Sequence, residues 1–155
     1  LELFGIKLSA IYRPLNNIFL NKTMENLRKN FICKNQIKKG IGGTREVIKA
    51  ISKNTSIALM IDQRVTEGKE SLLFNMPTYT TTIPAQLVKK YNCPVVPIYI
   101  ERKNKIYFDM TVESPIHFTK NDDIQSITQK LNTWLEKKIL INPDQWIWTH
   151  NKWKL

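Results

Sequence analysis

Strand-like and helix-like segments alternate along this chain, and their order constrains the fold more than any other feature of the sequence. KLSAIY (7–12) and the continuous apolar run SIALMI (56–61) are typical of strands, the second of a strand buried on both faces. Between them, apolar residues recur at helical spacing over residues 18–31, and a second helix is expected after KKGIGGT (38–44), capped by Thr44. Strands that alternate with helices predict an α/β fold.

The alternation continues in the second half of the chain. A loop is expected over residues 67–81, followed by a short helix that begins at Thr82 and Pro84. Two strand-like runs within residues 94–112 are separated by the turn RKNK, which predicts a hairpin, and a long helix is expected from about 122 to 139. The predicted architecture is a central mixed sheet flanked by helices, with a C-terminal hairpin and a long helix.

The length and composition of the chain set its broad class. A chain of 155 residues is enough for one domain with its own core, and we expect residues 1–155 to form a single domain. No apolar run approaches the roughly 18 residues that cross a bilayer. Because the first residue is Leu and not Met, we expect the chain to be truncated at its N-terminus. Cys33, Cys93 and the two histidines are too widely separated to predict a metal site, and no cofactor is expected.

The chain is strongly basic. It has 24 Lys and Arg residues against 13 Asp and Glu, a formal net charge of +11, and an isoelectric point near 9.7. Such an excess attracts polyanions, which include nucleic acid, anionic lipid headgroups and an acidic carrier protein. Charge alone does not choose among these partners.

Three segments place charged side chains where ligands commonly bind in α/β sheets, at the ends of strands and the beginnings of helices. Arg13 follows the first strand beside a proline, and Arg45 follows two glycines in the expected first turn of a helix, where free backbone N–H groups favour anions. Asp62 and Gln63 follow the buried run, so the Asp62 carboxylate should be partly desolvated. It could pair with Arg13, Arg45 or Arg64, either as a structural ion pair or as part of a site.

The tail DQWIWTHNKWK (144–154) holds three of the four tryptophans, interleaved with polar and basic residues. This pattern suits a membrane–water interface. Stacking on nucleic-acid bases and packing of the tail onto the core are the alternatives.

Six segments, taken together and in order, resemble the late acyltransferases of lipid A biosynthesis, which belong to the lysophospholipid acyltransferase superfamily. The segments are SAIYRPLNN (9–17), GGTREVIKAI (42–51), ALMIDQ (58–63), TTTIPAQL (80–87), CPVVPIYIER (93–102) and NPDQWIWTHNKWK (142–154). The resemblance covers essentially the whole chain, and the motifs are specific in combination.

This resemblance implies an enzyme that moves a fatty acyl group from acyl carrier protein to a hydroxyl of a lipid A precursor. It implies an α/β fold held on the cytoplasmic face of the bacterial inner membrane by an upstream hydrophobic segment. The expected partners are acyl carrier protein, the lipid A precursor and the anionic membrane surface, without nucleic acid. Arg13 matches a position that grips phosphate or a polar headgroup, and Asp62 and Gln63 match a block that supports substrate binding. Arg45 matches a basic position after the glycines, and residues 94–97 match a proline-flanked strand.

The catalytic motif of the family is a histidine followed five residues later by an acid, and it precedes the tyrosine-arginine-proline segment. None of the residues before Arg13 is a histidine, so we expect the motif upstream of Leu1 and no activity from this chain alone. His117 and Asp122 have the same spacing but follow Arg13 by about a hundred positions. We therefore predict that they are not a catalytic pair, and that Asp122 lies at or near the first turn of the last helix. A sister glycolipid acyltransferase and a non-enzymatic module that binds anionic membrane or nucleic acid are the alternative interpretations.

Overall fold

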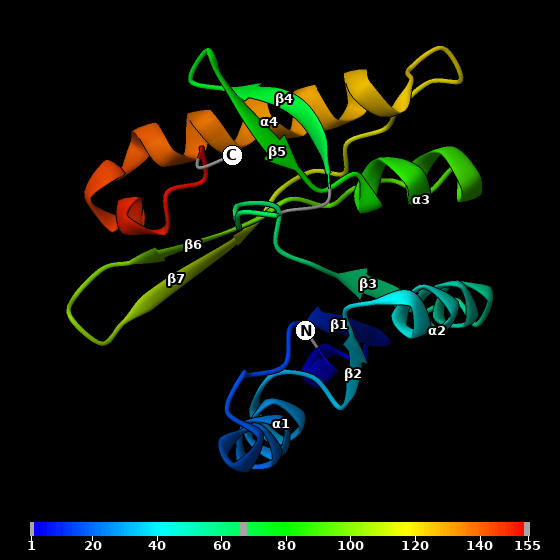
Figure 1. Cartoon of the computed structure of the whole chain (residues 1–155), viewed down its shortest axis with the longest axis vertical. Helices are drawn as coiled ribbons and strands as arrows, with labels where there is room; N and C mark the ends of the chain where they lie inside the picture. The colour runs from blue at the N-terminus through cyan, green and yellow to red at the C-terminus, as the bar shows by residue number, and fades with distance from the viewer. Residues whose placement is uncertain (1, 66–67, 154–155) are drawn as a thin grey trace. The chain divides into compact units, whose positions relative to one another are not determined.

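The computed structural model describes residues 2–65 and 68–153, without the side chains of Leu3 and Ile41. Over these residues the protein has four α-helices, and its strands form three small sheets (Figure 1). The predicted α/β class is confirmed. The predicted central mixed sheet is wrong in detail, because the strands divide into one parallel sheet and two separate antiparallel pairs. The chain divides into two compact units, Leu1–Met60 and Ile61–Leu155, and whether they act as the single expected domain stays a prediction.

The first unit is a three-stranded parallel sheet with the strand order β2-β1-β3. Its elements are η1 (Glu2–Phe4), β1 (Leu8–Tyr12), α1 (Ile18–Phe31), β2 (Asn35–Lys38), α2 (Ile41–Ser52) and β3 (Ser56–Ala58). Helix α2 connects β2 to β3 and contacts all three strands, whereas α1 contacts β2. The run 56–61 is therefore a shorter strand than predicted, and it is half-buried rather than buried on both faces.

Both helices of the first unit begin at residues that suit a helix start. The side chain of Asn17 accepts hydrogen bonds from the Phe19 and Leu20 amides, and α1 then covers the predicted residues, although none of its side chains is buried. The prediction that Thr44 caps α2 is wrong, because Gly40 precedes the helix with a φ of 137° that favours glycine. A Cβ atom on Gly43 would lie 2.0 Å from the carbonyl oxygen of Lys38, so glycine is needed there for α2 to approach β2.

The second unit is organised along one long helix. Its elements are β4 (Lys69–Leu73), β5 (Met76–Thr80), α3 (Ile83–Tyr91), β6 (Ile98–Arg102), β7 (Phe108–Val112), α4 (Ile124–Ile141), η2 (Pro143–Gln145) and η3 (Trp148–His150). Helix α4 contacts β4, α3 and η2, and the two strand pairs are antiparallel hairpins. The predicted β6–β7 hairpin and the helix that begins after Thr82 are confirmed.

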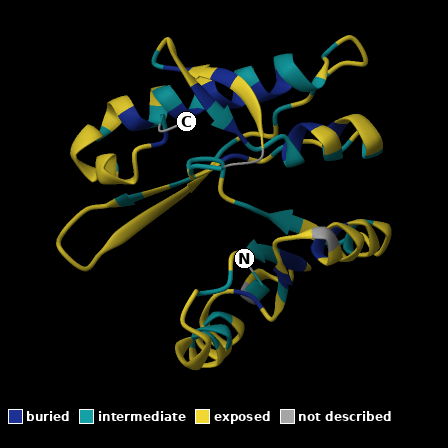
Figure 2. Ribbon diagram, viewed as in Figure 1, coloured by how far each residue is buried: buried dark blue, intermediate teal, exposed yellow. Residues whose placement is uncertain are grey.

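The apolar core of the second unit consists of two clusters along α4 (Figure 2). One joins α3 to the first half of α4 through Ala85, Val88, Ile127 and Leu131. The other joins β4 to the second half of α4 through Leu73, Leu135 and Ile139. Ile61 packs against both clusters, so the backbone that follows β3 is fixed to this core.

The β4–β5 hairpin occupies residues that we predicted to be a loop. Its inward positions are mostly polar, and its turn has a positive φ at both Phe74 and Asn75, as a tight two-residue hairpin turn requires. The fully buried Asn132 of α4 donates hydrogen bonds to the hydroxyl oxygens of Ser71 and Thr80 at 2.9 and 3.0 Å. The hairpin is therefore held by buried hydrogen bonds, which hydrophobic periodicity does not reveal.

Candidate functional site

The segment from Asp62 to Arg64 follows Ile61 and has no regular secondary structure. Asp62 and Arg64 are half-buried, and Gln63 is exposed. The Oδ1 atom of Asp62 and the Nε atom of Arg64 are buried and have no hydrogen-bond partner within residues 2–65 and 68–153. Buried polar atoms are normally paired in folded proteins, so two unpaired groups two residues apart mark this segment as a candidate site.

The C-terminal tail holds this segment by its backbone. The Lys152 ammonium donates hydrogen bonds to the carbonyl oxygens of Ile61 and Gln63 at 2.9 and 3.2 Å. The Arg64 amide donates a hydrogen bond to Nε2 of His150 at 2.9 Å. Two tail side chains therefore fix three backbone groups around Asp62, and we call this arrangement of His150 and Lys152 the tail clamp.

Lys152 is unusual because it is an ionisable residue that is only 2% exposed. Burial lowers the pKa of its ammonium group to about 8, and the negative charge of Asp62 partly opposes this shift. In addition, the Lys152 carbonyl accepts a hydrogen bond from the Thr78 hydroxyl at 2.7 Å, which ties the tail to β5. The Asp62 carboxylate thus has a lysine as its charged neighbour, which the sequence did not indicate.

The arginines proposed as partners of Asp62 are arranged differently from the prediction. No ion pair within 4 Å joins Asp62 to an arginine in the part of the chain that the structure describes. Arg13 is exposed just after β1, and Arg45 is exposed one turn inside α2, so the prediction that it lies at free helix N–H groups is wrong. Because Arg13 and Asp62 belong to different units, their proximity stays a prediction.

The tryptophan tail packs against its own unit. Trp146 and Trp153 contact the cluster of Leu73, Leu135 and Ile139, and the indole N–H of Trp153 donates to the Leu73 carbonyl at 3.1 Å. The rings of Trp148 and Trp153 stack with centroids 6.2 Å apart. This packing favours the core alternative over the membrane interface and also places the tail clamp beside Asp62.

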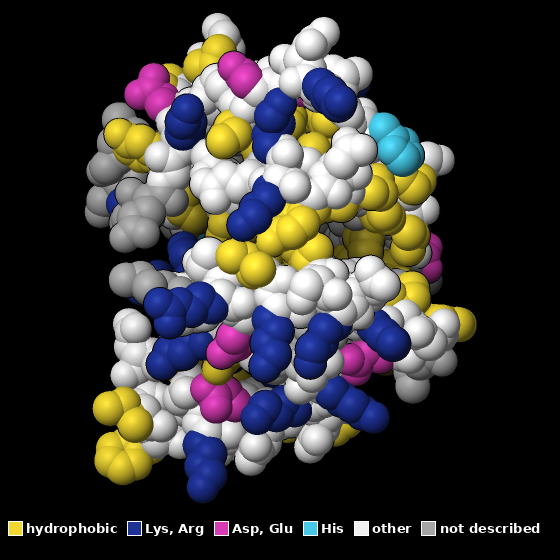
Figure 3. All heavy atoms as spheres, turned by 90° about the vertical axis from the view of Figure 1, so that its right-hand side faces the viewer, with side chains coloured by type: hydrophobic (Ala, Val, Ile, Leu, Met, Phe, Trp, Pro, Cys, Tyr) yellow, Lys and Arg dark blue, Asp and Glu magenta, His cyan; other side chains and the backbone are white. Residues whose placement is uncertain are grey.

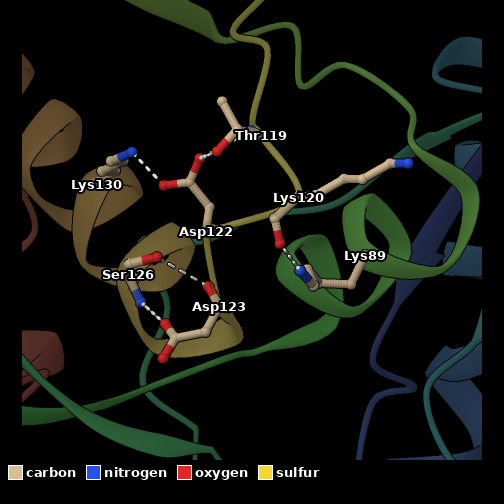
Figure 4. A network of polar contacts seen from close by, with 7 residues as sticks. All are labelled: Lys89, Thr119, Lys120, Asp122, Asp123, Ser126 and Lys130. Atoms are coloured by element: carbon tan, nitrogen blue, oxygen red, sulfur yellow. Dashed lines mark hydrogen bonds and ion pairs between the residues drawn. The ribbon is translucent and has the colours of Figure 1, made fainter.

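Asp122 and His117 are not hydrogen-bonded to each other. The Asp122 carboxylate accepts from the amide and hydroxyl of Thr119 at 2.8 and 2.9 Å and pairs with Lys130 (Figure 4). His117 is exposed. The Lys130 ammonium, followed by the Thr119 donors, lowers the pKa of Asp122 to about 2. The helix cap is Asp123, which accepts from the Ser126 amide at 2.7 Å, so Asp122 lies near the first turn of α4, as predicted, and directly precedes the cap.

The sequence of this chain was compared with models of known protein families. The sequence profile described as bacterial lipid A biosynthesis acyltransferase matches residues 1–155. The chain belongs to this family. A search of curated proteins found no match.

Membership of the lipid A acyltransferase family supports an acyltransferase of lipid A synthesis, and it implies a lipid A precursor as substrate. The resemblance drawn from the tyrosine-arginine-proline and aspartate-glutamine motifs is confirmed at the level of the family. Within residues 2–65 and 68–153, no helix is both long enough and apolar enough to cross a membrane.

Proposed function

We propose that the full-length lipid A acyltransferase transfers a fatty acyl group from acyl carrier protein to a hydroxyl of a lipid A precursor, at the cytoplasmic face of the inner membrane. The observation that carries the proposal is the family match over residues 1–155. The net charge of +11 supports it, because the carrier, the phosphorylated precursor and the membrane are all anionic.

The chemistry requires a general base and donors for an oxyanion. A hydroxyl is a poor nucleophile and must lose its proton during attack, and the thioester carbonyl becomes negatively charged in the transition state. No hydrogen bond joins a histidine to a carboxylate among the residues that the structure describes. We propose, from the resemblance to the family, that the base is a histidine with an acid five residues later, in a motif that precedes the tyrosine-arginine-proline segment and hence Leu1.

The residues of this chain are then proposed to bind and orient substrate. The unpaired Oδ1 atom of Asp62 is available to accept a hydrogen bond from a substrate or from the catalytic histidine. Gln63 is exposed next to it, and Arg13 and Arg45 are exposed guanidinium groups suited to phosphate. The tail clamp keeps the Asp62 backbone in place while these contacts form.

The proposal is tested with purified full-length protein, radiolabelled acyl carrier protein thioester and a lipid A precursor that has free hydroxyl groups. We expect transfer of the label to the precursor, detected by thin-layer chromatography. Transfer to another glycolipid but not to the lipid A precursor, or no transfer to either, would contradict the proposal.

The two histidines of the chain provide a matched pair of variants. We expect His117→Ala to retain near-normal turnover in the full-length enzyme, because His117 is exposed and does not contact Asp122. We expect His150→Ala to lower turnover several-fold, because it removes the acceptor of the Arg64 amide beside Asp62. A hundredfold loss in His117→Ala, the effect of removing a general base, would restore it as a catalytic residue.

A further inference from the structure

The positive charge of the chain is concentrated in the first unit. Residues 1–60 hold 11 of the 24 Lys and Arg residues but only three of the 13 Asp and Glu residues, so they carry a formal charge of +8 out of +11. Figure 3 shows Lys and Arg side chains gathered over the lower part of the view, which holds this unit. A local excess of this size attracts an anionic partner even at moderate salt.

Part of this charge lines a groove. The groove has a volume of about 490 Å³ and lies between the C-terminal halves of α1 and α2 and the edge strand β2. Four exposed lysines line it: Lys29, Lys34, Lys49 and Lys53. Glu46 is the one acidic residue of the lining, so the groove carries a net charge of +3.

The lysines of the groove do not neutralise acidic groups of the protein. No ion pair within 4 Å involves any of the four ammonium groups in the described part of the chain. Lys29 and Lys49 lie in the last turns of their helices, and Lys53 caps α2, so each contributes a modest favourable interaction with a helix dipole. Lys34 lies between elements and has no such role. Interaction with the helix dipoles therefore does not account for a cluster of four lysines on one concave surface.

The groove lies toward the amino ends of the strands of the first unit. Ser9 near the amino end of β1, three residues of β2 that begin with its first residue Asn35, and Thr55 before β3 line it, whereas Arg13 follows the carboxyl end of β1. Active sites of α/β sheets form at the carboxyl ends of the strands. The groove is therefore suited to docking a partner and not to binding the reacting groups.

We propose that this lysine groove docks an acidic protein, whose carboxylates pair with its lysines. Under the function proposed above, on which the identity of this partner rests, the docked protein is the acyl carrier that delivers the thioester. The lining supports a protein over a membrane, because its only aliphatic side chains are Ile37, which is buried, and Ala50, which is half-buried. A surface that inserts into a membrane needs exposed apolar side chains, and stacking of nucleic-acid bases needs aromatic ones.

The test measures binding directly, so it does not depend on turnover. Fluorescently labelled acyl carrier protein is titrated with full-length enzyme in which Lys49 and Lys53 are both replaced by Glu. The matched control carries the same charge change at Lys120 and Lys137, which are exposed, unpaired in the described residues and located in the second unit. We expect the groove variant to bind the carrier at least about tenfold more weakly and the control less than threefold, at about 0.1 M salt.

Two further measurements distinguish a specific loss of carrier binding from a loss of stability and from a general loss of binding to anionic surfaces. A Lys49→Gln, Lys53→Gln variant avoids placing acids at a helix C-terminus and should show an intermediate loss with an unchanged melting temperature. Binding to vesicles of phosphatidylcholine and phosphatidylglycerol should be equal in the groove and control variants. Equal losses of carrier binding in both variants, or a selective loss of vesicle binding in the groove variant, would overturn the inference. A protein that binds the carrier through the groove but transfers no acyl group would contradict only the proposed function.

Discussion

Replacing Asp62 by asparagine in the full-length enzyme is expected to lower kcat/KM for acyl transfer by about a hundredfold or more, the usual effect of losing one oriented polar contact in a transition state. Asparagine keeps the shape of the side chain but removes its negative charge. The Oδ1 atom of Asp62 is buried and has no partner within residues 2–65 and 68–153, so its charge is available to a group that arrives with substrate or from elsewhere in the enzyme. A carboxylate that served only the fold would have its hydrogen bonds satisfied within the protein.

Acyl transfer by Asp62→Asn is compared with transfer by Asp144→Asn, which makes the same chemical change at an exposed residue of η2. We expect the control to keep its activity, and we expect thermal unfolding to show that both variants are folded. A variant at Asp62 with normal kcat/KM and a lowered melting temperature would show that the residue serves only as a neighbour for Lys152. It would also remove Asp62 from the proposed substrate site.

The elements that the sequence predicted correctly have local signals. The start of α1 depends on Asn17 and that of α3 on the residues around Thr82 and Pro84, and each signal lies within a few residues of the helix it starts. The β6–β7 hairpin likewise joins two apolar runs that are adjacent in sequence. Such elements can be predicted because the side chains that determine them are close along the chain.

The β4–β5 hairpin could not be predicted in the same way. Its buried face consists largely of Ser71, Thr78 and Thr80, whose hydroxyl groups make hydrogen bonds with Asn132 and the tail. Polar residues on a buried face resemble a loop when only hydrophobicity is considered. Their partners lie more than 50 residues away along the chain, and only the folded structure brings them together.

In the candidate site, too, the sequence predicted the feature with a local signal and missed the one that depends on a distant residue. The apolar run before Asp62 correctly indicated a partly buried carboxylate at that position. Its charged neighbour was expected among the arginines, but the structure places Lys152 there, 91 positions after the Ile61 carbonyl to which it donates a hydrogen bond. A lysine between tryptophans in a basic tail carries no signal in the sequence that distinguishes it from a surface lysine.

Replacing Lys152 by methionine is expected to lower the free energy of unfolding of the full-length protein by about 3 kcal/mol at pH 7. Methionine fills a similar volume but donates no hydrogen bonds. The carbonyl groups of Ile61 and Gln63 would lose their partner, and the half-buried Asp62 carboxylate would lose its neighbouring positive charge. Removing one member of a buried charged group costs more than removing all of it, because the remaining polar groups stay buried without partners.

The control for this variant is Lys137→Met, at an exposed position of α4 that makes no ion pair in the described residues. We expect it to change the free energy of unfolding by less than about 0.5 kcal/mol. Chemical denaturation followed by tryptophan fluorescence measures both variants, since Trp146 and Trp153 pack beside the clamp. Equal stability of the two variants would show that the tail clamp contributes little to the fold.

The pH dependence of unfolding tests the clamp more specifically. The pKa of Lys152 is about 8 in the folded protein and 10.5 for an ordinary lysine, so between these values the unfolded chain holds a proton that the folded protein has released. The unfolding free energy therefore gains a contribution that rises with pH, by about 2 kcal/mol from pH 8 to pH 9.5. Lys152→Met lacks this contribution, whereas Tyr12 and the two cysteines, whose pKa values are raised by burial, titrate alike in both proteins. The stability difference between wild type and variant should accordingly widen over this interval, and a difference that stays constant would show that Lys152 is not buried as a charged group.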